Sequence, residues 1–375
     1  MGNKLVSDSS YGKIMIRLNK GKYTAGDQVE GMIYLDLYTP FPTSVLNLLI
    51  TGREKVRIIE SRMVNNPANN RMEEKISIHE DERNFYEHNF PIYTVNAMNF
   101  LPGQYTFPFT FKLLENLPGR FHHTYSKGGH SGYGIIEYEI FAGFKSLTSS
   151  LAFFDSVNML VDQRAELTNG PVQTQTDRNF TGYCYKNLGG IGLKCQFDKD
   201  RFVVGDNANM NIEIDATNAK TDVTKINVSL VQEITFKTNN SAHNYIYSKT
   251  ISNFMLGGVK AGSKKVGMDS IPVTMNIRPD REEQATTVGE LVKNNYRLSV
   301  ATELDSCLCC DSPPMAGADV RIFNKALPMP EPFNVPNFQP KIMDPYVCTV
   351  SNDYRLSQDM RKDLDLNDET NYPTL

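Results

Sequence analysis

The chain has 375 residues, of which 40% are hydrophobic and 22% charged, so a buried core is feasible and wholesale disorder is excluded. The length predicts two domains with tails, because single cores usually stop growing well before that size. The formal net charge of −4 argues against a nucleic-acid binder that depends on a general basic field.

No stretch approaches the roughly 20 apolar residues of a membrane span, and the N-terminus lacks the apolar run of a secretory signal. Cys307, Cys309 and Cys310 are crowded together, whereas a disulfide framework would spread its pairs through the fold. We therefore expect a cytoplasmic protein whose cysteines are thiols.

Residues 1–11 are predicted to be an N-terminal tail that approaches a myristoylation signal. Gly2 is the candidate acylation site, but Val6 stands where Ser or Thr is expected. A single acyl chain anchors a protein only reversibly. An ordinary exposed terminus is the favoured interpretation.

A pattern near the N-terminus is repeated later in the chain. Each copy carries a basic residue, an aromatic residue, a Gly-Asp pair and then an alternating strand. The offset between Lys20 and Lys199 is 179 residues, and so is the offset between Asp27 and Asp206. Three further pairs of blocks recur in the same order: 46–50 with 226–230, 107–111 with 271–275, and 137–142 with 295–300.

Period-two alternation in these blocks indicates half-buried strands, and short strands between Gly, Asn, Asp and Pro turns favour sandwiches. The sequence therefore predicts an all-β chain of two tandem antiparallel, immunoglobulin-like β-sandwiches with a disordered C-terminal tail. The expected divisions are 12–165 for the first sandwich, 166–182 for a connector, 183–325 for the second sandwich and 326–375 for a Pro-rich, then acidic tail.

Three segments within this frame differ from simple strands. Residues 60–89 are polar, with an Asn-rich centre, and are predicted to form a long exposed loop. Pro108 inside 105–111 predicts an edge strand or a bulge, since proline cannot donate to the ladder. In the tail Leu356, Met360 and Leu364 have helical spacing, but disorder is favoured because isolated short helices are marginal.

Two groups of residues are candidates for chemical sites. His122, His123 and His130 lie in a Gly-rich stretch and are candidates for a metal, but a solvated loop is favoured because no Cys or carboxylate spacing supports them. For Cys307, Cys309 and Cys310 an incidental thiol turn is favoured over lipidation or metal binding. No nucleophile elbow is present, so no catalytic residue, metal or cofactor is expected.

Several of these segments resemble one family. Residues 23–31, which read YTAGDQVEG, resemble the opening of arrestin-like N-domains. The Tyr-x-Phe-Pro-Phe motif at 105–109 and the Leu-Pro-x-x-Phe motif at 117–121 are similar to a pair in the same family, and 136–142 is similar to the strand that follows. The resemblance covers about residues 12–325 and points to arrestin-domain-containing, α-arrestin-type proteins more than to visual and β-arrestins.

The resemblance carries over only a few functional residues. Receptor-activated arrestins hold a buried Arg among acidic partners, a switch that phosphate disrupts. Glu30 matches one acidic partner, but Asp162 stands where the Arg belongs, and Val6 and Ser7 replace a lysine pair. Phosphate-triggered activation is therefore not expected. The tail has Asp344-Pro345-Tyr346 instead of the Pro-Pro-x-Tyr motif by which relatives capture ubiquitin ligases.

The resemblance implies a non-enzymatic adaptor that links cytoplasmic tails of membrane receptors or transporters to endocytic or ubiquitin-dependent trafficking. It also implies coat proteins or ubiquitin ligases as partners and recruitment to the plasma membrane or endosomes. Binding is expected at sheet edges, concave faces and residues 60–89. The alternatives are a retromer-type trafficking subunit and a peripheral lipid-binding β-sandwich module, although Asp305 and Asp311 alone do not supply calcium ligands.

Overall fold

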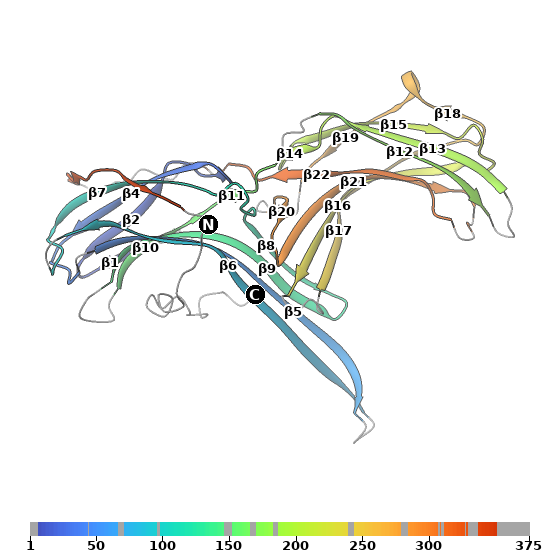
Figure 1. The fold of residues 1–375 in the computed structure, drawn as a ribbon. Coiled ribbons are helices and arrows are strands. Elements are labelled where there is room, and N and C mark those ends of the chain that lie inside the picture. Colours follow the sequence, from blue (N-terminus) through green and yellow to red (C-terminus); the bar gives the residue numbers. More distant parts are fainter. Residues whose placement is uncertain are drawn as a thin grey trace.

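The computed structural model describes residues 7–43, 45–66, 71–95, 98–145, 152–165, 170–182, 187–238, 244–278, 284–306, 308, 311–326, 328 and 337–350. These residues form two β-sandwiches arranged end to end (Figure 1). The predicted all-β, two-sandwich class is confirmed. No helix among the described residues is long and apolar enough to cross a membrane.

The N-terminal sandwich has two main sheets and one small one. The first sheet contains β1 (Ser7–Ser9), β2 (Gly12–Leu18), β4 (Gln28–Leu37) and β7 (Gly103–Lys112), with β23 (Lys341–Ile342) and β24 (Tyr346–Cys348) along the far side of β7. The second contains β10 (Ala152–Met159), β9 (His130–Lys145), β5 (Val45–Asn66) and β6 (Arg71–Thr94), with β8 (Phe121–Lys127) beside β9. The third pairs β3 (Tyr23–Thr24) with β11 (Val161–Asp162).

The C-terminal sandwich repeats this plan. One sheet contains β12 (Val172–Thr181), β13 (Asn187–Phe197) and β15 (Asn207–Asp215), with β18 (Lys264–Lys265) and β19 (Ile271–Asn276) beside β15. The other contains β14 (Arg201–Val203), β22 (Met315–Phe323), β21 (Val292–Leu304), β16 (Val223–Lys237) and β17 (Asn244–Val259), with β20 (Thr287–Val288) beside β21.

Alternation along each strand produces the two cores. In β2, Ile14, Ile16 and Leu18 are buried while Lys13 and Arg17 lie on the outer side. Each such aliphatic side chain stabilises the fold by about 1.5–3 kcal/mol when fully buried. The inner rows of the facing sheets form one hydrophobic cluster per sandwich.

The repeated Gly-Asp pairs form the same turn in both domains. Gly26 and Gly205 have φ angles of 92° and 95°, which favour glycine. The carboxylates of Asp27 and Asp206 each accept a hydrogen bond from the backbone N–H three residues earlier, at 2.9 and 3.1 Å. The 179-residue repeat is therefore a structural repeat.

The basic and aromatic residues ahead of these turns also pair in both copies. The Lys20 ammonium lies 5.9 Å from the Tyr23 ring centroid, and the Lys199 ammonium lies 5.0 Å from that of Phe202. Both rings are buried. The strands that contain these rings, β3 and β14, each pair in parallel with a later strand of their own domain, β11 and β22.

The C-terminal tail is not wholly disordered, and that part of the prediction is wrong. Strands β23 and β24 add in parallel to β7, with Lys341 opposite Tyr105 and Tyr346 opposite Phe109. The register shifts by one residue between them, where Pro108 and Pro345 lie. Proline cannot donate to a ladder, so the break between the two short strands falls where neither chain could extend the pairing.

The tail strands also contribute to the N-terminal core. Cys348 is 3% exposed, and Met343, Tyr346 and Val350 pack against the same cluster. Burial raises the pKa of the Cys348 thiol to about 12, so this thiol stays protonated. The segment with Leu356, Met360 and Leu364, for which we predict disorder in preference to a short helix, lies outside the described residues.

Two predicted boundaries also differ from the structure. The connector expected at 166–182 contains β12, which pairs along its length with β13. Strand β12 lies at a sheet edge, and Phe180 is its one buried residue. Its sequence is therefore mostly polar, which is also typical of a linker. The N-terminal tail expected at 1–11 includes β1, which pairs with β2.

Deleting the tail strands should destabilise the N-terminal sandwich. A chain stopped after Ala326 loses β23 and β24, and we expect it to lose roughly 2–4 kcal/mol of unfolding free energy through exposure of the side chains that β24 buries. A chain stopped after Val350 keeps both strands and should unfold like the full chain. Urea denaturation of the three proteins checks this; equal stability of both truncations would contradict it.

Candidate interaction surfaces

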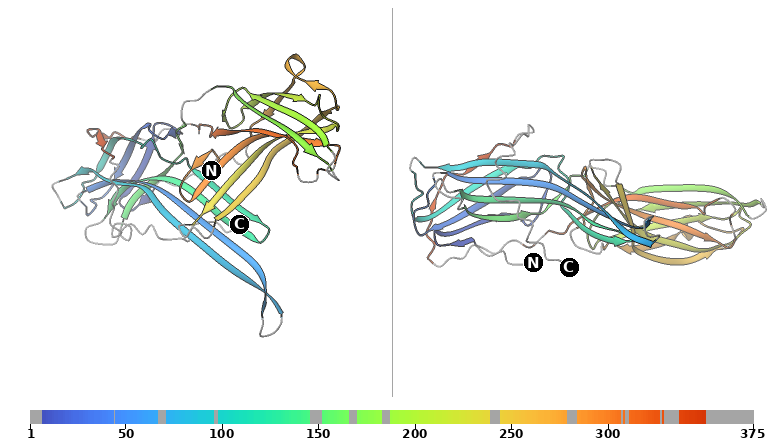
Figure 2. Two further views of the ribbon diagram at one scale, coloured as in Figure 1. Left: turned by 45° about the vertical axis from the view of Figure 1, so that its right-hand side comes forward. Right: turned by 90° about the horizontal axis from the view of Figure 1, so that it is seen from below.

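Residues 60–66 and 71–89 lie on strands β5 and β6, whose outer part is a protruding β-ribbon, so the loop predicted at 60–89 is wrong. Pairing between β5 and β9 ends at Glu60, which faces His130. Beyond that point β5 and β6 pair only with each other, out to Asn66 and Arg71. The ribbon extends well past both sandwiches (Figures 1 and 2). The sequence of the ribbon is polar because a two-stranded ribbon has no face buried in a core. Such a polar sequence is also typical of a loop, which is why a loop was predicted.

The register separates the ribbon's side chains into two rows. Directly opposite residues of an antiparallel pair share one face, and successive residues alternate between faces. Ile59 faces Ile78, Ser61 faces Ile76, and Asn65 faces Met72. We call the large apolar side chains of this face the apolar row: Ile59, Met63, Met72, Ile76 and Ile78.

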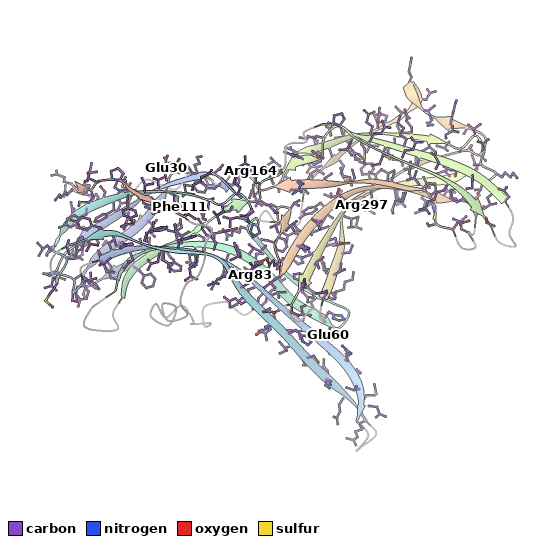
Figure 3. The ribbon with its side chains drawn as sticks, in the orientation of Figure 1. Glu30, Glu60, Arg83, Phe111, Arg164 and Arg297 are labelled. Atoms are coloured by element: carbon purple, nitrogen blue, oxygen red, sulfur yellow. The ribbon has the colours of Figure 1, made fainter. Side chains whose placement is uncertain are left out.

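The apolar row is strongly exposed. Met63, Met72, Ile76 and Ile78 have exposed fractions of 59%, 58%, 58% and 51%. The opposite face is charged around Glu60 (Figure 3), where the Arg62 guanidinium lies 2.5 Å from the Glu60 carboxylate and lowers its pKa. Clustered exposed apolar side chains bordered by polar ones mark binding surfaces in soluble proteins.

Ion pairs border the apolar row on the sandwich side. The Lys55 ammonium lies 3.4 Å from Glu82, and the Arg57 guanidinium lies 2.8 Å from Glu80. All four side chains are on the same outer face of the sheet as the apolar row, by the alternation of β5 and β6. The surface is thus an apolar patch with a charged border at the base of the ribbon.

The two sandwiches meet at several polar contacts, one of which centres on Asp162. Its carboxylate lies 3.0 Å from the Lys22 ammonium and accepts a hydrogen bond of 2.8 Å from the Asn324 amide. Asn324 follows β22, so this contact joins the domains. Burial raises the pKa of Asp162, while Lys22 and Asn324 act in the opposite direction.

The two residues matched to the family's polar core do not share a site. Asp162 is 1% exposed at the junction. Glu30 is exposed on β4, where its carboxylate accepts a hydrogen bond of 2.9 Å from the Asn19 amide (Figure 3). The junction therefore places a buried anion, paired with Lys22, where the resemblance implied a buried Arg. Sequence reasoning did not find Lys22 or Asn324, because they lie far from Asp162 in the chain.

A second buried carboxylate joins the domains at Glu54, which is 1% exposed on β5. Its Oε2 accepts hydrogen bonds from the backbone N–H groups of Glu290 and Leu291, at 3.1 and 3.5 Å. Burial raises the pKa of Glu54, and these N–H groups partly oppose that shift. Nearby, Arg83 forms an ion pair with Glu290 (Figure 3 labels Arg83).

The three histidines that are candidates for metal ligands lie on strands β8 and β9, so the expectation of a solvated loop is wrong. His130 stacks on Tyr245 at 4.9 Å, and His123 packs against Tyr247 at 5.2 Å. Tyr125, between them on β8, stacks on Phe236 and Tyr245, at 4.7 Å from each ring.

This aromatic stack is a domain contact, because β8 and β9 belong to the first sandwich and β16 and β17 to the second. The His123 ring also lies within 3.0 Å of the Gln284 amide, which holds it on the second domain. His122 is exposed on β8. Among the described residues no group of three His, Cys, Asp or Glu side chains could hold a metal ion.

The lipidation candidates Gly2, Cys307, Cys309 and Cys310 lie outside the described residues, so their modification stays a prediction. Leu308, between the cysteines, forms an isolated bridge with Gly182. That bridge places Leu308 beside the end of β12.

Comparisons with known proteins agree with this architecture. The family model described as Arrestin (or S-antigen), N-terminal domain, matches residues 13–159, and the one described as Arrestin (or S-antigen), C-terminal domain, matches residues 188–325. The chain is also similar to Arrestin domain-containing protein A of Dictyostelium discoideum, with 30% identity over 117 residues. That match covers 30% of this chain and 19% of the relative.

The chain belongs to the arrestin family. The two family matches lie on the two sandwiches, and membership supports an adaptor role in general terms. Because the chain spans about a fifth of the length of the curated relative, that protein's own activity and partners do not transfer as findings.

Replacing Glu54 should change the pH dependence of stability. The ordinary pKa of glutamate is 4.5 and the folded value is higher, so the folded state holds this proton more tightly than the unfolded chain does. The wild type should therefore lose stability relative to Glu54→Gln as pH rises from about 4.5 through the folded pKa. Urea denaturation between pH 4.5 and 8 measures this, with exposed Glu82→Gln as control; parallel profiles for wild type and Glu54→Gln would refute it.

Reversing one charge of the Lys22–Asp162 pair should separate the domains. Asp162→Lys places two cations together at a buried position, and we expect a loss of about 3–5 kcal/mol in unfolding free energy. Adding Lys22→Asp should recover much of that loss. Chemical denaturation of both single variants and the double variant gives the coupling; strictly additive losses would show that the pair does not hold the junction.

Proposed function

We propose that this protein is a non-enzymatic arrestin-type adaptor whose apolar row binds the cytoplasmic part of a membrane protein. The observation that carries the proposal is the exposure of Met63, Met72, Ile76 and Ile78 on one face of a ribbon that projects beyond both domains. Membership of the arrestin family supports the adaptor class.

The ribbon's chemistry favours a protein partner over a bilayer. The Arg62–Glu60 ion pair lies on the face of the ribbon opposite the apolar row. Burying such charges in hydrocarbon is costly. Docking by one face leaves this pair in water and covers only the apolar row.

The junction supports a fixed presentation of the ribbon. Glu54 lies on β5, the strand that continues into the ribbon, and it is bound to the second domain through the backbone at Glu290. Arg83 on β6 is paired with Glu290 as well. Both ribbon strands are thus tied to the second domain at their base. A rigid base reduces the entropy lost when the ribbon binds.

We further propose that the bound membrane protein is passed to endocytic or ubiquitin-dependent trafficking through coat proteins or a ubiquitin ligase. This step is supported by the family alone. Recruitment to the plasma membrane or endosomes would follow from the cargo. No described contact favours the retromer-type subunit or the lipid-binding module, so these remain as outcomes of the test.

Charge on the apolar row should abolish cargo binding. Ile76→Lys combined with Met63→Lys removes two exposed anchors, each contributing about 1.5–3 kcal/mol if buried by a partner, so retention should fall at least tenfold. Val64→Lys is the matched control, because Val64 is 44% exposed on the opposite face of the same ribbon. The measurement is quantitative affinity purification of the full chain from detergent-solubilised membranes of the native cells, with retained proteins identified by mass.

Integral membrane proteins retained by the wild type and Val64→Lys but lost from the double variant would support the proposal. Equal retention by all three proteins would contradict the assignment of the apolar row. One stoichiometric set of trafficking subunits would favour the retromer-type alternative, and lipid without protein would favour the membrane module.

A further inference from the structure

The strand β17 ends one sheet of the second sandwich and has an outer edge without a partner strand among the described residues. It pairs with β16 on one side, and the sheet order ends there. Figure 1 shows β17 at the rim of that sheet. Alternate backbone N–H and C=O groups of an edge strand point outward and can accept another strand.

Several other edges among the described strands are protected. Natural sheets protect their edges with charges, prolines or a covering segment. The edge of β7 is covered by the tail strands. Two further edges are charged and one carries a proline: Arg71, Glu73, Glu74, Lys75 and 80–83 on β6, Asp177 and Arg178 on β12, and Pro272 on β19.

By contrast, β17 has 16 residues with Lys249 as its one charge and no proline. A bulge at Ile251 divides the strand, since Leu230 faces Ser252 while Val231 faces Thr250. The half before the bulge meets the first domain through Tyr245. The half after the bulge, residues 251–259, is uncharged.

Side chains along the second half are incompletely covered. Ile251, Phe254 and Leu256 pack against the core of the second sandwich but remain half-buried. Met255, on the outer face, is 62% exposed. A further strand beside β17 would pair its backbone and cover the inner three side chains at the same time.

We propose that this edge is a self-association surface, on which β17 of a second copy of the chain pairs antiparallel about a two-fold axis at Met255. Met255 is the central residue of the uncharged stretch 251–259, so this register gives the longest overlap. A two-fold pairing places each edge against itself, and an uncharged edge can do so without opposing like charges. The charged edges of β6 and β12 could not.

The choice of a second copy follows from this self-complementarity. The outer-face residues of the stretch, Asn253, Met255 and Gly257, are symmetric about the axis and carry no charge to select a foreign strand. The pairing would join two sheets into one continuous sheet across the dimer. An interface of one strand pair is small, below about 1,200 Å², so the dimer is expected to be weak.

Sedimentation equilibrium of the full chain under reducing conditions, up to about 1 mM, tests the proposal over the range of weak specific association. The wild type should shift from monomer to dimer mass with concentration. Met255→Lys and Met255→Glu should each weaken dimerisation at least tenfold, because like charges then meet at the axis. An equimolar mixture of the two variants should dimerise again, because opposite charges meet there. Met315→Lys is the control, since Met315 is 54% exposed on β22 of the same sheet, which is separated from β17 by β21 and β16.

A wild type that stays monomeric throughout would overturn the proposal. A dimer that persists unchanged in Met255→Lys would also overturn it, because another surface would then hold the copies together. Failure of the mixed variants to associate would overturn the register centred on Met255. None of these outcomes depends on the adaptor function or on the apolar row of the ribbon.

Discussion

Each sheet in this protein must bury one face and must also protect or pair its two backbone edges. The first requirement is met by the alternating strands, whose inner rows form one core in each sandwich. The second is met differently at each edge. The tail covers β7, charges line β6 and β12, and β17 is left with little protection. The ribbon and the tail strands are additions to the two-sandwich plan. The β17 edge belongs to that plan, and no described strand covers it.

The junction between the sandwiches combines apolar stacking with buried carboxylates. The ring stack around Tyr125 supplies contact area, whereas Glu54 and Asp162 supply directional hydrogen bonds from one domain to the other. Buried carboxylates are costly unless they are paired, so such contacts define one arrangement of the domains more than they add stability. Asp162, which is paired with Lys22, also differs in sign from the buried Arg that the family resemblance implied.

The β5–β6 ribbon and the tail strands are additions to the two-sandwich plan of this chain. The ribbon carries an apolar row that no part of this chain described by the structure covers. The tail adds to the edge of β7 through a core residue, Cys348, and so behaves as a structural strand of the first sandwich. Any release of that strand would expose part of the core.

The sequence by itself determined the fold class, the two-domain plan and the equivalent turns, because alternation and the 179-residue repeat are local patterns. The resemblance also implied that Asp162 stands where receptor-activated arrestins have an Arg. The sequence could not identify the ribbon, since the few apolar residues of that segment stand among many polar ones and are not buried, nor β12, whose polar edge pattern resembles a linker. The tail strands and the histidine stack were decided by tertiary structure alone. Lys341 meets Tyr105, and His130 meets Tyr245, across long stretches of chain, and no local pattern encodes such contacts.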